Sequence, residues 1–184
     1  SLWGGLGTDT ADFSDASVSM TLTLNGEALG TATASDSIVG NSGSDVLYGI
    51  ENVVGSGFSD TITADASDNV IDGGAGADSI LAGDGNDTLV YDAADTLLDG
   101  GNGTETWVVR DATLDLTALS GSTVQNVEVV DLRGSQATQL TLSVAAVASL
   151  SGSVNALTVL ADGQDTVDLV GAWTSAAATV VDGQ

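Results

Sequence analysis

The stretch IDGGAGADSILAGDGNDTLV, residues 71–90, contains two near-copies of one nine-residue unit. In each copy a glycine-rich turn leads to an acidic residue, and a large apolar residue follows two positions later. Stepping by nine from Gly73 in both directions gives six contiguous units over residues 55–108. A fixed period that persists over several units is typical of a solenoid, in which each unit forms part of a coil.

Positions six and eight of the unit keep their chemical character throughout the block. The sixth positions are Asp60, Asn69, Asp78, Asp87, Thr96 and Glu105, and the eighth positions are Ile62, Ile71, Ile80, Leu89, Leu98 and Trp107. Two further copies, residues 4–12 and 40–48, place Asp9 and Asp45 at position six. Residues 1–3 fit the end of a preceding unit, so we expect the chain to begin within a repeat.

Each unit is too short to bury its apolar residue alone. Glycines allow the left-handed backbone of a tight turn, and the residues after the acid form a short strand whose middle side chain points inward. Stacked coils of two units would bury these side chains in a narrow continuous core. Turns on one side then recur every 18 residues, about 4.8 Å apart in space.

Carboxylates stacked at that spacing repel one another unless a cation lies between them. The chain has 26 acidic residues, two basic residues and a net charge of −24, with no cysteine and no histidine. Its ligands are therefore carboxylate, amide and backbone carbonyl oxygens, which favour calcium over transition metals. We expect several calcium ions.

The predicted calcium ligands are side chains at position six and the glycines of the best-formed turns. They are Asp9, Asp45, Asp60, Asn69, Asp78, Asp87 and Glu105, with Gly73, Gly74, Gly76, Gly83 and Gly85. Secondary candidates are Asp84, Asp95, Asp162 and Asp165. Turns 18 residues apart pair Asp60 with Asp78 as the best site, and Asp87 with both Asn69 and Glu105. The pair of Asp78 and Thr96 is weaker, because Thr96 is a poor ligand, although Asp92 and Asp95 are near.

GGAGADSIL (73–81) and AGDGNDTLV (82–90) match the pattern Gly-Gly-x-Gly-x-Asp-x-U-x, where U is a large apolar residue. This pattern resembles the RTX (repeats-in-toxin) family, and the resemblance covers residues 1 to about 108. It implies an all-β fold, a right-handed parallel β-roll (β-solenoid) with calcium-binding Gly/Asp turns. It also implies type I secretion from a Gram-negative cell, unfolded at low cytosolic calcium, with folding outside the cell.

We expect three parts in the chain. Residues 1–39 contain a degenerate repeat and, from the alternation of Val18, Met20, Leu22 and Leu24 before Asn25-Gly26, a strand or hairpin that makes an excursion from the roll. Residues 40–108 form the β-roll, with a six-residue connection at 49–54. Residues 109–184 are β-rich, and either continue the solenoid in longer coils or cap it as a small sandwich. Residues 143–152 predict a short helix capped by Ser143 and ended by Gly152.

Two functions fit these features. One is a structural module of a secreted bacterial cell-surface protein (an adhesin, S-layer or extracellular filament) that folds on calcium binding and self-associates end to end. The other is an accessory export and folding segment of a secreted enzyme or toxin. The charge disfavours nucleic acid, and no apolar stretch is long enough for membrane insertion. Without histidine or cysteine, the remaining catalytic options are paired carboxylates or an arginine base beside calcium. Such enzymes need a shaped groove, and the chain shows no loops long enough to build one, so we expect no enzymatic activity in these residues.

Overall fold

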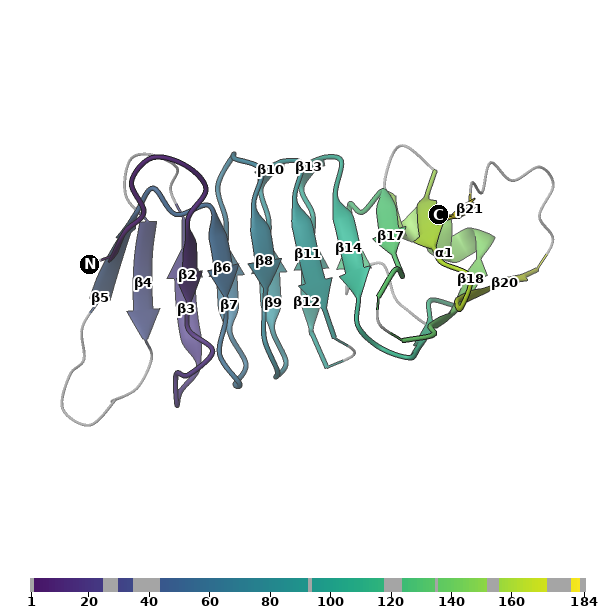
Figure 1. Ribbon diagram of the computed structural model, residues 1–184, viewed down its shortest axis with the longest axis horizontal. Helices are drawn as coiled ribbons and strands as arrows, with labels where there is room; N and C mark the ends of the chain where they lie inside the picture. The colour runs from purple at the N-terminus through teal and green to yellow at the C-terminus, as the bar shows by residue number, and fades with distance from the viewer. Residues whose placement is uncertain are drawn as a thin grey trace.

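The computed structural model describes residues 2–24, 30–34, 44–92, 94–117, 124–134, 136–151, 156–171 and 180–182. For residues 2–3, 30–34, 44–48 and 180–182 it describes the backbone alone. The fold is an elongated stack of β coils (Figure 1). The elements are β1 (Leu2–Trp3), β2 (Thr10–Asp12), β3 (Met20–Thr23), β4 (Gly30–Ala34), β5 (Ser44–Tyr48), β6 (Asn52–Val54), β7 (Thr61–Thr63), β8 (Val70–Asp72), β9 (Ser79–Leu81), β10 (Asp84–Gly85), β11 (Thr88–Tyr91), β12 (Leu97–Asp99), β13 (Asn102–Gly103), β14 (Thr106–Val109), β15 (Thr113–Asp115), β16 (Val124–Gln125), β17 (Val129–Asp131), β18 (Gln139–Ser143), α1 (Val144–Leu150), β19 (Thr158–Ala161), β20 (Thr166–Val170) and β21 (Val180–Asp182).

Two eight-stranded sheets form the long walls of the stack. The first sheet has the order β1-β5-β4-β3-β7-β9-β12-β16, and the second has the order β2-β6-β8-β11-β14-β17-β19-β21. Successive repeat strands alternate between the sheets, and repeat strands in one sheet pair in parallel. The prediction of a parallel β-roll is therefore confirmed.

The core of the roll is a pair of ladders made by the position-eight side chains. Ile62, Ile80 and Leu98 are in register in the first sheet, and Ile71, Leu89 and Trp107 are in register in the second. All six side chains have no exposed surface. Coils 18 residues apart therefore place like residues above one another, as the nine-residue period predicts.

The N-terminal hairpin is present, but its predicted place as an excursion from the roll is wrong. β3 and β4 are antiparallel, while β3 also pairs in parallel with β7, so the hairpin lies within the first sheet. The reason is burial: Met20, Leu22 and Leu24 alternate inward and join the same core as Ile62. The predicted turn at Asn25-Gly26 lies outside the described residues.

The six-residue connection at 49–54 is also part of the roll. Residues 52–54 form β6, which pairs with β2 and β8 in the second sheet. Val53 is 1% exposed and lies in register with Ile71. The segment forms a strand because Val53 takes the inward position that the eighth residue takes in a repeat.

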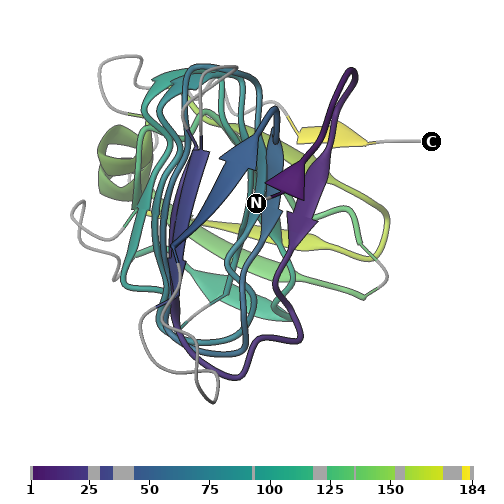
Figure 2. The ribbon, with the colours of Figure 1, turned by 90° about the vertical axis from the view of Figure 1, so that its left-hand side faces the viewer.

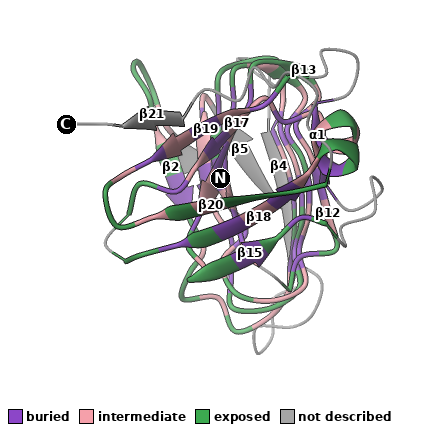
Figure 3. Ribbon diagram, turned by 90° about the vertical axis from the view of Figure 1, so that its right-hand side faces the viewer, coloured by how far each residue is buried: buried purple, intermediate pink, exposed green. Residues whose placement is uncertain are grey.

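Beyond β14 the second sheet continues in longer coils, whereas the first sheet ends at β16. β17, β19 and β21 extend the second sheet, while β15, β18 and β20 form a separate three-stranded parallel sheet. In the first sheet β16 is the last strand, and α1 contacts β16 on that side. Figures 2 and 3 show these layers from the two ends of the stack.

The short helix is confirmed with its predicted cap. The Ser143 side chain accepts a hydrogen bond from the backbone N–H of Ala146 (3.1 Å). The helix ends at Leu150 with Ser151 as its C-cap, and the predicted stop at Gly152 lies outside the described residues. Leu150 is buried, so the helix covers the core where the first sheet ends.

Candidate metal centre

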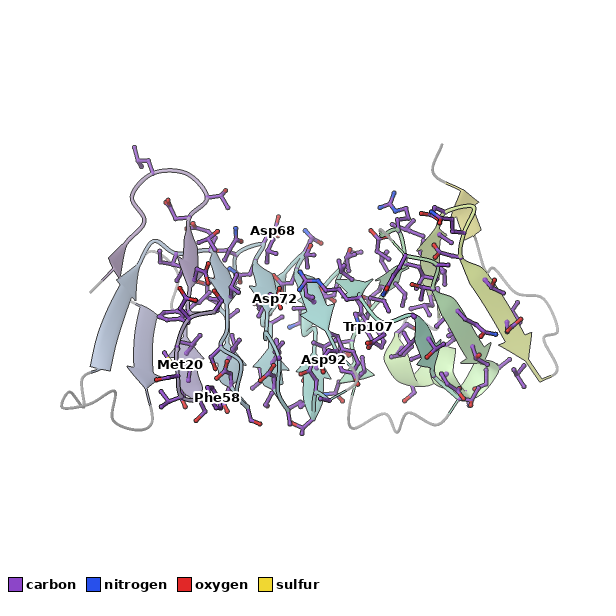
Figure 4. The ribbon with its side chains drawn as sticks, turned by 60° about the horizontal axis from the view of Figure 1, so that its bottom comes forward. Met20, Phe58, Asp68, Asp72, Asp92 and Trp107 are labelled. Atoms are coloured by element: carbon purple, nitrogen blue, oxygen red, sulfur yellow. The ribbon has the colours of Figure 1, made fainter. Side chains whose placement is uncertain are left out.

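The glycine-rich turns form two columns on opposite edges of the stack. We call the turns that precede β7, β9 and β12 the first turn column, and the turns that precede β8, β11 and β14 the second turn column. In Figure 4, Phe58 and Asp92 lie toward one edge and Asp68 lies on the opposite edge, with Trp107 between these edges. Each column therefore brings together turns that are 18 residues apart in the sequence.

Turns within a column stack closely enough that their glycines are required. Gly74 has a φ of +90°, and a Cβ there would lie 2.0 Å from the carbonyl oxygen of Ser56 in the preceding coil. Gly101 also has a φ of +90°, with the carbonyl oxygen of Gly83 1.8 Å from its would-be Cβ. The same oxygen accepts a hydrogen bond from the Asn102 N–H (2.8 Å). The turn backbones therefore bond directly to one another.

The five predicted glycines all take part in this stacking or in enclosing a carboxylate. Positive φ angles occur at Gly74, Gly76, Gly83 and Gly85. Gly73 acts differently: a Cβ there would lie 2.5 Å from Oδ2 of Asp78. The turn therefore closes over the carboxylate of its own sixth residue.

In the first turn column each carboxylate reaches back to the preceding coil. Asp78 Oδ1 accepts a hydrogen bond from the backbone N–H of Asp60 (2.7 Å), and Asp95 Oδ1 accepts one from the N–H of Asp78 (3.1 Å). Asp60 Oδ1 accepts one from the N–H of Met20 (2.6 Å). These bonds form a ladder of carboxylates along the column.

The predicted pair of Asp78 and Thr96 is corrected by this ladder. Thr96 donates its hydroxyl proton to the carbonyl oxygen of Asp78 (2.9 Å), whereas Asp95 supplies the carboxylate. The two aspartates are 17 residues apart. The glycine-free turn 91–95 brings its acid into the column one position earlier than the nine-residue period predicts.

The second turn column has the same ladder, with members that the sequence did not identify. Asp87 Oδ1 accepts a hydrogen bond from the N–H of Asn69 (2.8 Å). Glu51 Oε2 accepts one from the N–H of Asp9 (2.8 Å), and Glu128 Oε2 accepts one from the N–H of Glu105 (3.1 Å). Glu51 and Glu128 therefore take the part of a position-six acid outside any glycine-rich turn.

A sequence signal for Glu51 and Glu128 exists. Glu51 lies two residues before Val53, and Glu128 lies two residues before Val130. Both valines are about 1% exposed or less. This is the spacing between positions six and eight of a repeat, but it lacks the glycine turn that marks the other units.

Several position-six oxygen atoms are buried without a hydrogen-bond partner. Within the described part of the chain these are Asp9 Oδ2, Asn69 Oδ1, Asp78 Oδ2, Asp87 Oδ2 and both carboxylate oxygens of Glu105. A buried carboxylate without a donor is unfavourable, because burial removes its hydration. A cation would satisfy these oxygens.

Burial also raises the pKa of these carboxyl groups. It is the first cause in raising the pKa of Asp78 and Asp87 to about 6, and that of Asp95 to about 7. Nearby acidic groups raise all three further. The pKa of Glu105 is also raised, first by burial and then by the Glu128 carboxyl group. Without a cation the folded turns therefore bind protons more tightly than the unfolded chain does.

The donor set fits calcium when backbone atoms are included. Among the described residues no three Asp or Glu side chains converge as an acidic cage. The stacked turns do present backbone carbonyl oxygens, such as those of Ser56 and Gly83, toward the next turn. Carbonyl and carboxylate oxygens together are the ligands that calcium prefers. Asp78, Asp87 and Glu105 are the side chains with which the turns would hold it.

The predicted best pair, Asp60 and Asp78, is asymmetric. Asp60 is already supplied with donors, since its two oxygens accept hydrogen bonds from the N–H and the hydroxyl of Ser56 and from the N–H of Met20. Asp78 keeps one oxygen without a partner among the described residues. Asp78 is therefore the better candidate calcium ligand of the two.

The remaining candidates differ in their surroundings. Asp84 is exposed at a turn tip, where it accepts a hydrogen bond from the Asn102 side chain (2.8 Å). Asp165 accepts hydrogen bonds from the N–H groups of Thr138 (2.9 Å) and Asp162 (2.8 Å), in a turn like that of Asp92 and Asp95. The side chain of Asp45 lies outside the described residues.

Comparison with known proteins gives one result that bears on these turns. A family model for the RTX calcium-binding nonapeptide repeat (4 copies) matches residues 32–49 and 54–89. A search of the curated proteins found no match. Across the described residues, none of the helices has the length and apolar character needed to span a membrane.

Proposed function

Since the chain is an RTX repeat protein with a calcium-binding β-roll, we propose that it is a structural module of a secreted bacterial cell-surface protein. The module folds when calcium binds to its turns outside the cell. Its direct role is to form a rigid rod between other parts of an adhesin, surface layer or extracellular filament.

The observation that carries the proposal is the set of buried position-six oxygens without donors. The whole chain carries a net charge of −24, with 26 acidic residues and two basic residues. Folding without cations therefore leaves buried carboxylates both unsatisfied and close together. Because the unfolded chain lacks the stacked turns, the free energy of calcium binding becomes free energy of folding.

A second observation supports the role as a rod. β17, β19 and β21 add to the same sheet as the repeat strands, so the part after the repeats lengthens the same stack. We propose no catalysis in these residues, because the chain has no histidine or cysteine. End-to-end self-association is part of the proposal, since stacked sheets can pair through their outermost strands.

Sedimentation velocity with calcium raised from zero to about 10 mM tests the proposal, since extracellular calcium sites bind at millimolar concentrations. We expect an expanded chain to become compact, with a matching gain of β signal in far-ultraviolet circular dichroism. Large species that form with calcium and dissociate when calcium is removed would support the proposed end-to-end self-association. A sedimentation coefficient that does not change at any calcium concentration would refute the proposal.

A further inference from the structure

The second turn column does not end at the last glycine-rich turn. The Glu105 N–H donates to Glu128 Oε2, just as the Asn69 N–H donates to Asp87 Oδ1 earlier in the same column. The backbone continues the same ladder, because the N–H of Val129 donates to the carbonyl oxygen of Glu105 (2.9 Å). Glu128 therefore accepts the same backbone hydrogen bond as a position-six acid of the repeats, although it lies in a longer coil.

The turn that carries Glu128 also stacks like a repeat turn. Asn126 adopts a φ of 55°, the left-handed conformation that glycine takes in the repeats. Its carbonyl oxygen would lie 1.9 Å from a Cβ at Gly100, and the Gly100 N–H donates to the carbonyl oxygen of Gln125 (3.1 Å). The segment 125–128 is therefore a short turn in close contact with the turn 100–105.

Glu105 is enclosed between these two turns. Its side chain is 1% exposed, and neither carboxylate oxygen has a hydrogen-bond partner within the described residues. A Cβ at Gly103 would lie 2.5 Å from Oε1 of Glu105, so the carboxylate lies beneath its own turn. Burial raises the pKa of Glu105 first, and the adjacent Glu128 carboxyl group raises it further, through a side-chain hydrogen bond that forms when one of the two is protonated and then through its negative charge.

No side chain of the protein is free to neutralise this pair. The chain contains two basic residues, and both are already engaged. Arg110 forms an ion pair with Asp72 (2.7 Å), and Arg133 forms one with Asp131 (2.9 Å). The positive charge at Glu105 and Glu128 therefore has to come from solution.

We propose that Glu105 and Glu128 form a further calcium site at the junction between the repeat coils and the longer coils. The inference rests on the proposed calcium-dependent folding, and it extends the metal column beyond the glycine-rich repeats. The site uses two glutamate carboxylates together with carbonyl oxygens of the turns 100–105 and 125–128. It joins β14 to β17 and so transmits calcium-dependent order from the repeats into the C-terminal coils.

The test is the number of calcium ions bound per chain, measured by equilibrium dialysis with radioactive calcium on the wild type and on Glu128→Gln. The glutamine retains an oxygen that can accept the Glu105 N–H bond, so the substitution removes charge with little change in shape. We expect Glu128→Gln to bind one ion fewer than the wild type. The control is Asp15→Asn, which removes one exposed charge outside both columns and should leave the number unchanged.

Hydrogen–deuterium exchange on the same samples shows where the ion acts. In Glu128→Gln the calcium-dependent protection of β17 should fall, while that of β8 and β11 is retained, which also shows that the variant folds. An unchanged ion count in Glu128→Gln would overturn the inference, with the pair then held by a shared proton. A wild type that binds no calcium at all would instead refute the proposed function.

Discussion

Lowering the pH should stabilise this protein when calcium is absent and destabilise it when calcium is bound, and this prediction follows from the buried carboxyl groups. We consider the protein in calcium-free buffer as the pH is lowered from 8 to 5. In the folded chain Asp78 and Asp87 have a pKa of about 6 and Asp95 has one of about 7, against the ordinary aspartate value of 3.8. The folded chain therefore binds more protons than the unfolded chain between about pH 4 and pH 7. Its stability is lost as the pH rises through the folded pKa values and is regained as the pH falls.

The size of the effect follows from the pKa differences. For one carboxyl group, each unit by which the folded pKa exceeds the unfolded pKa changes the free energy of unfolding by about 1.4 kcal/mol. Screening by solvent next to the turns reduces the contribution, and we expect about 1 kcal/mol each from Asp78, Asp87 and Asp95 between pH 8 and pH 5. The total of roughly 3 kcal/mol is a large fraction of the stability of a small domain. Acid should thus partly replace calcium.

The assay is urea unfolding followed by circular dichroism in buffers stripped of calcium by a chelating resin. We expect the unfolding midpoint, or the folded fraction without urea, to increase as the pH falls from 8 to 5. In millimolar calcium the trend should reverse, because protons compete with calcium for the same carboxylates. A calcium-free protein whose stability falls or stays constant toward pH 5 would refute the reasoning.

Three substitutions test other parts of the structure. Asp78→Ala should lower calcium affinity about tenfold or more, which is about 1.4 kcal/mol of binding free energy. Asp162→Ala should have little effect, because Asp162 lies in a turn whose carboxylates already accept backbone N–H bonds. Equal losses of affinity in calorimetric titrations would contradict this ranking. Gly101→Ala should destabilise the calcium-bound protein by about 2 kcal/mol or more, since its Cβ would meet a carbonyl oxygen of the preceding turn. Gly163→Ala, which meets no atom within 4 Å, is the matched control in urea unfolding. Ile80→Ala should lower the free energy of unfolding by about 2–5 kcal/mol in the same measurement, because the Ile80 side chain has no exposed surface. A loss below about 1 kcal/mol would show that the ladder of position-eight side chains does not stabilise the core.

Much of the repeat region can be predicted from the sequence, because the residues within each unit determine its local structure. The glycines specify the turn, and the apolar residue at position eight specifies the inward side of the strand. These features are local, and the period of nine places equal residues one coil apart. The parallel β-roll and the inward positions of Ile80 and Leu89 follow from that period, and both are confirmed.

The strand pairing of the hairpin and of the C-terminal coils cannot be predicted from the sequence in the same way, because it joins residues at irregular separations. The alternation from Met20 to Leu24 indicates a strand, but it does not say which neighbour covers its edge. In the structure β3 lies beside β7, and the register from Thr106 to Val129 and then to Thr158 departs from the step of 18. Burial of apolar side chains in one continuous core decides these positions.

For the metal centre, the sequence by itself determined which residue types face the turns and that oxygen ligands and a cation are required. Only the tertiary structure decided which carboxylates are buried without a donor. In the structure Asp95, and not Thr96, is the carboxylate that bonds to the Asp78 N–H. Asp60 accepts hydrogen bonds from Ser56, and Glu128 accepts one from the Glu105 N–H. The physical reason is that a carboxylate's hydration and hydrogen bonds depend on the neighbouring coil, which is 17 residues away for Asp95 and Asp78 and 23 residues away for Glu128 and Glu105.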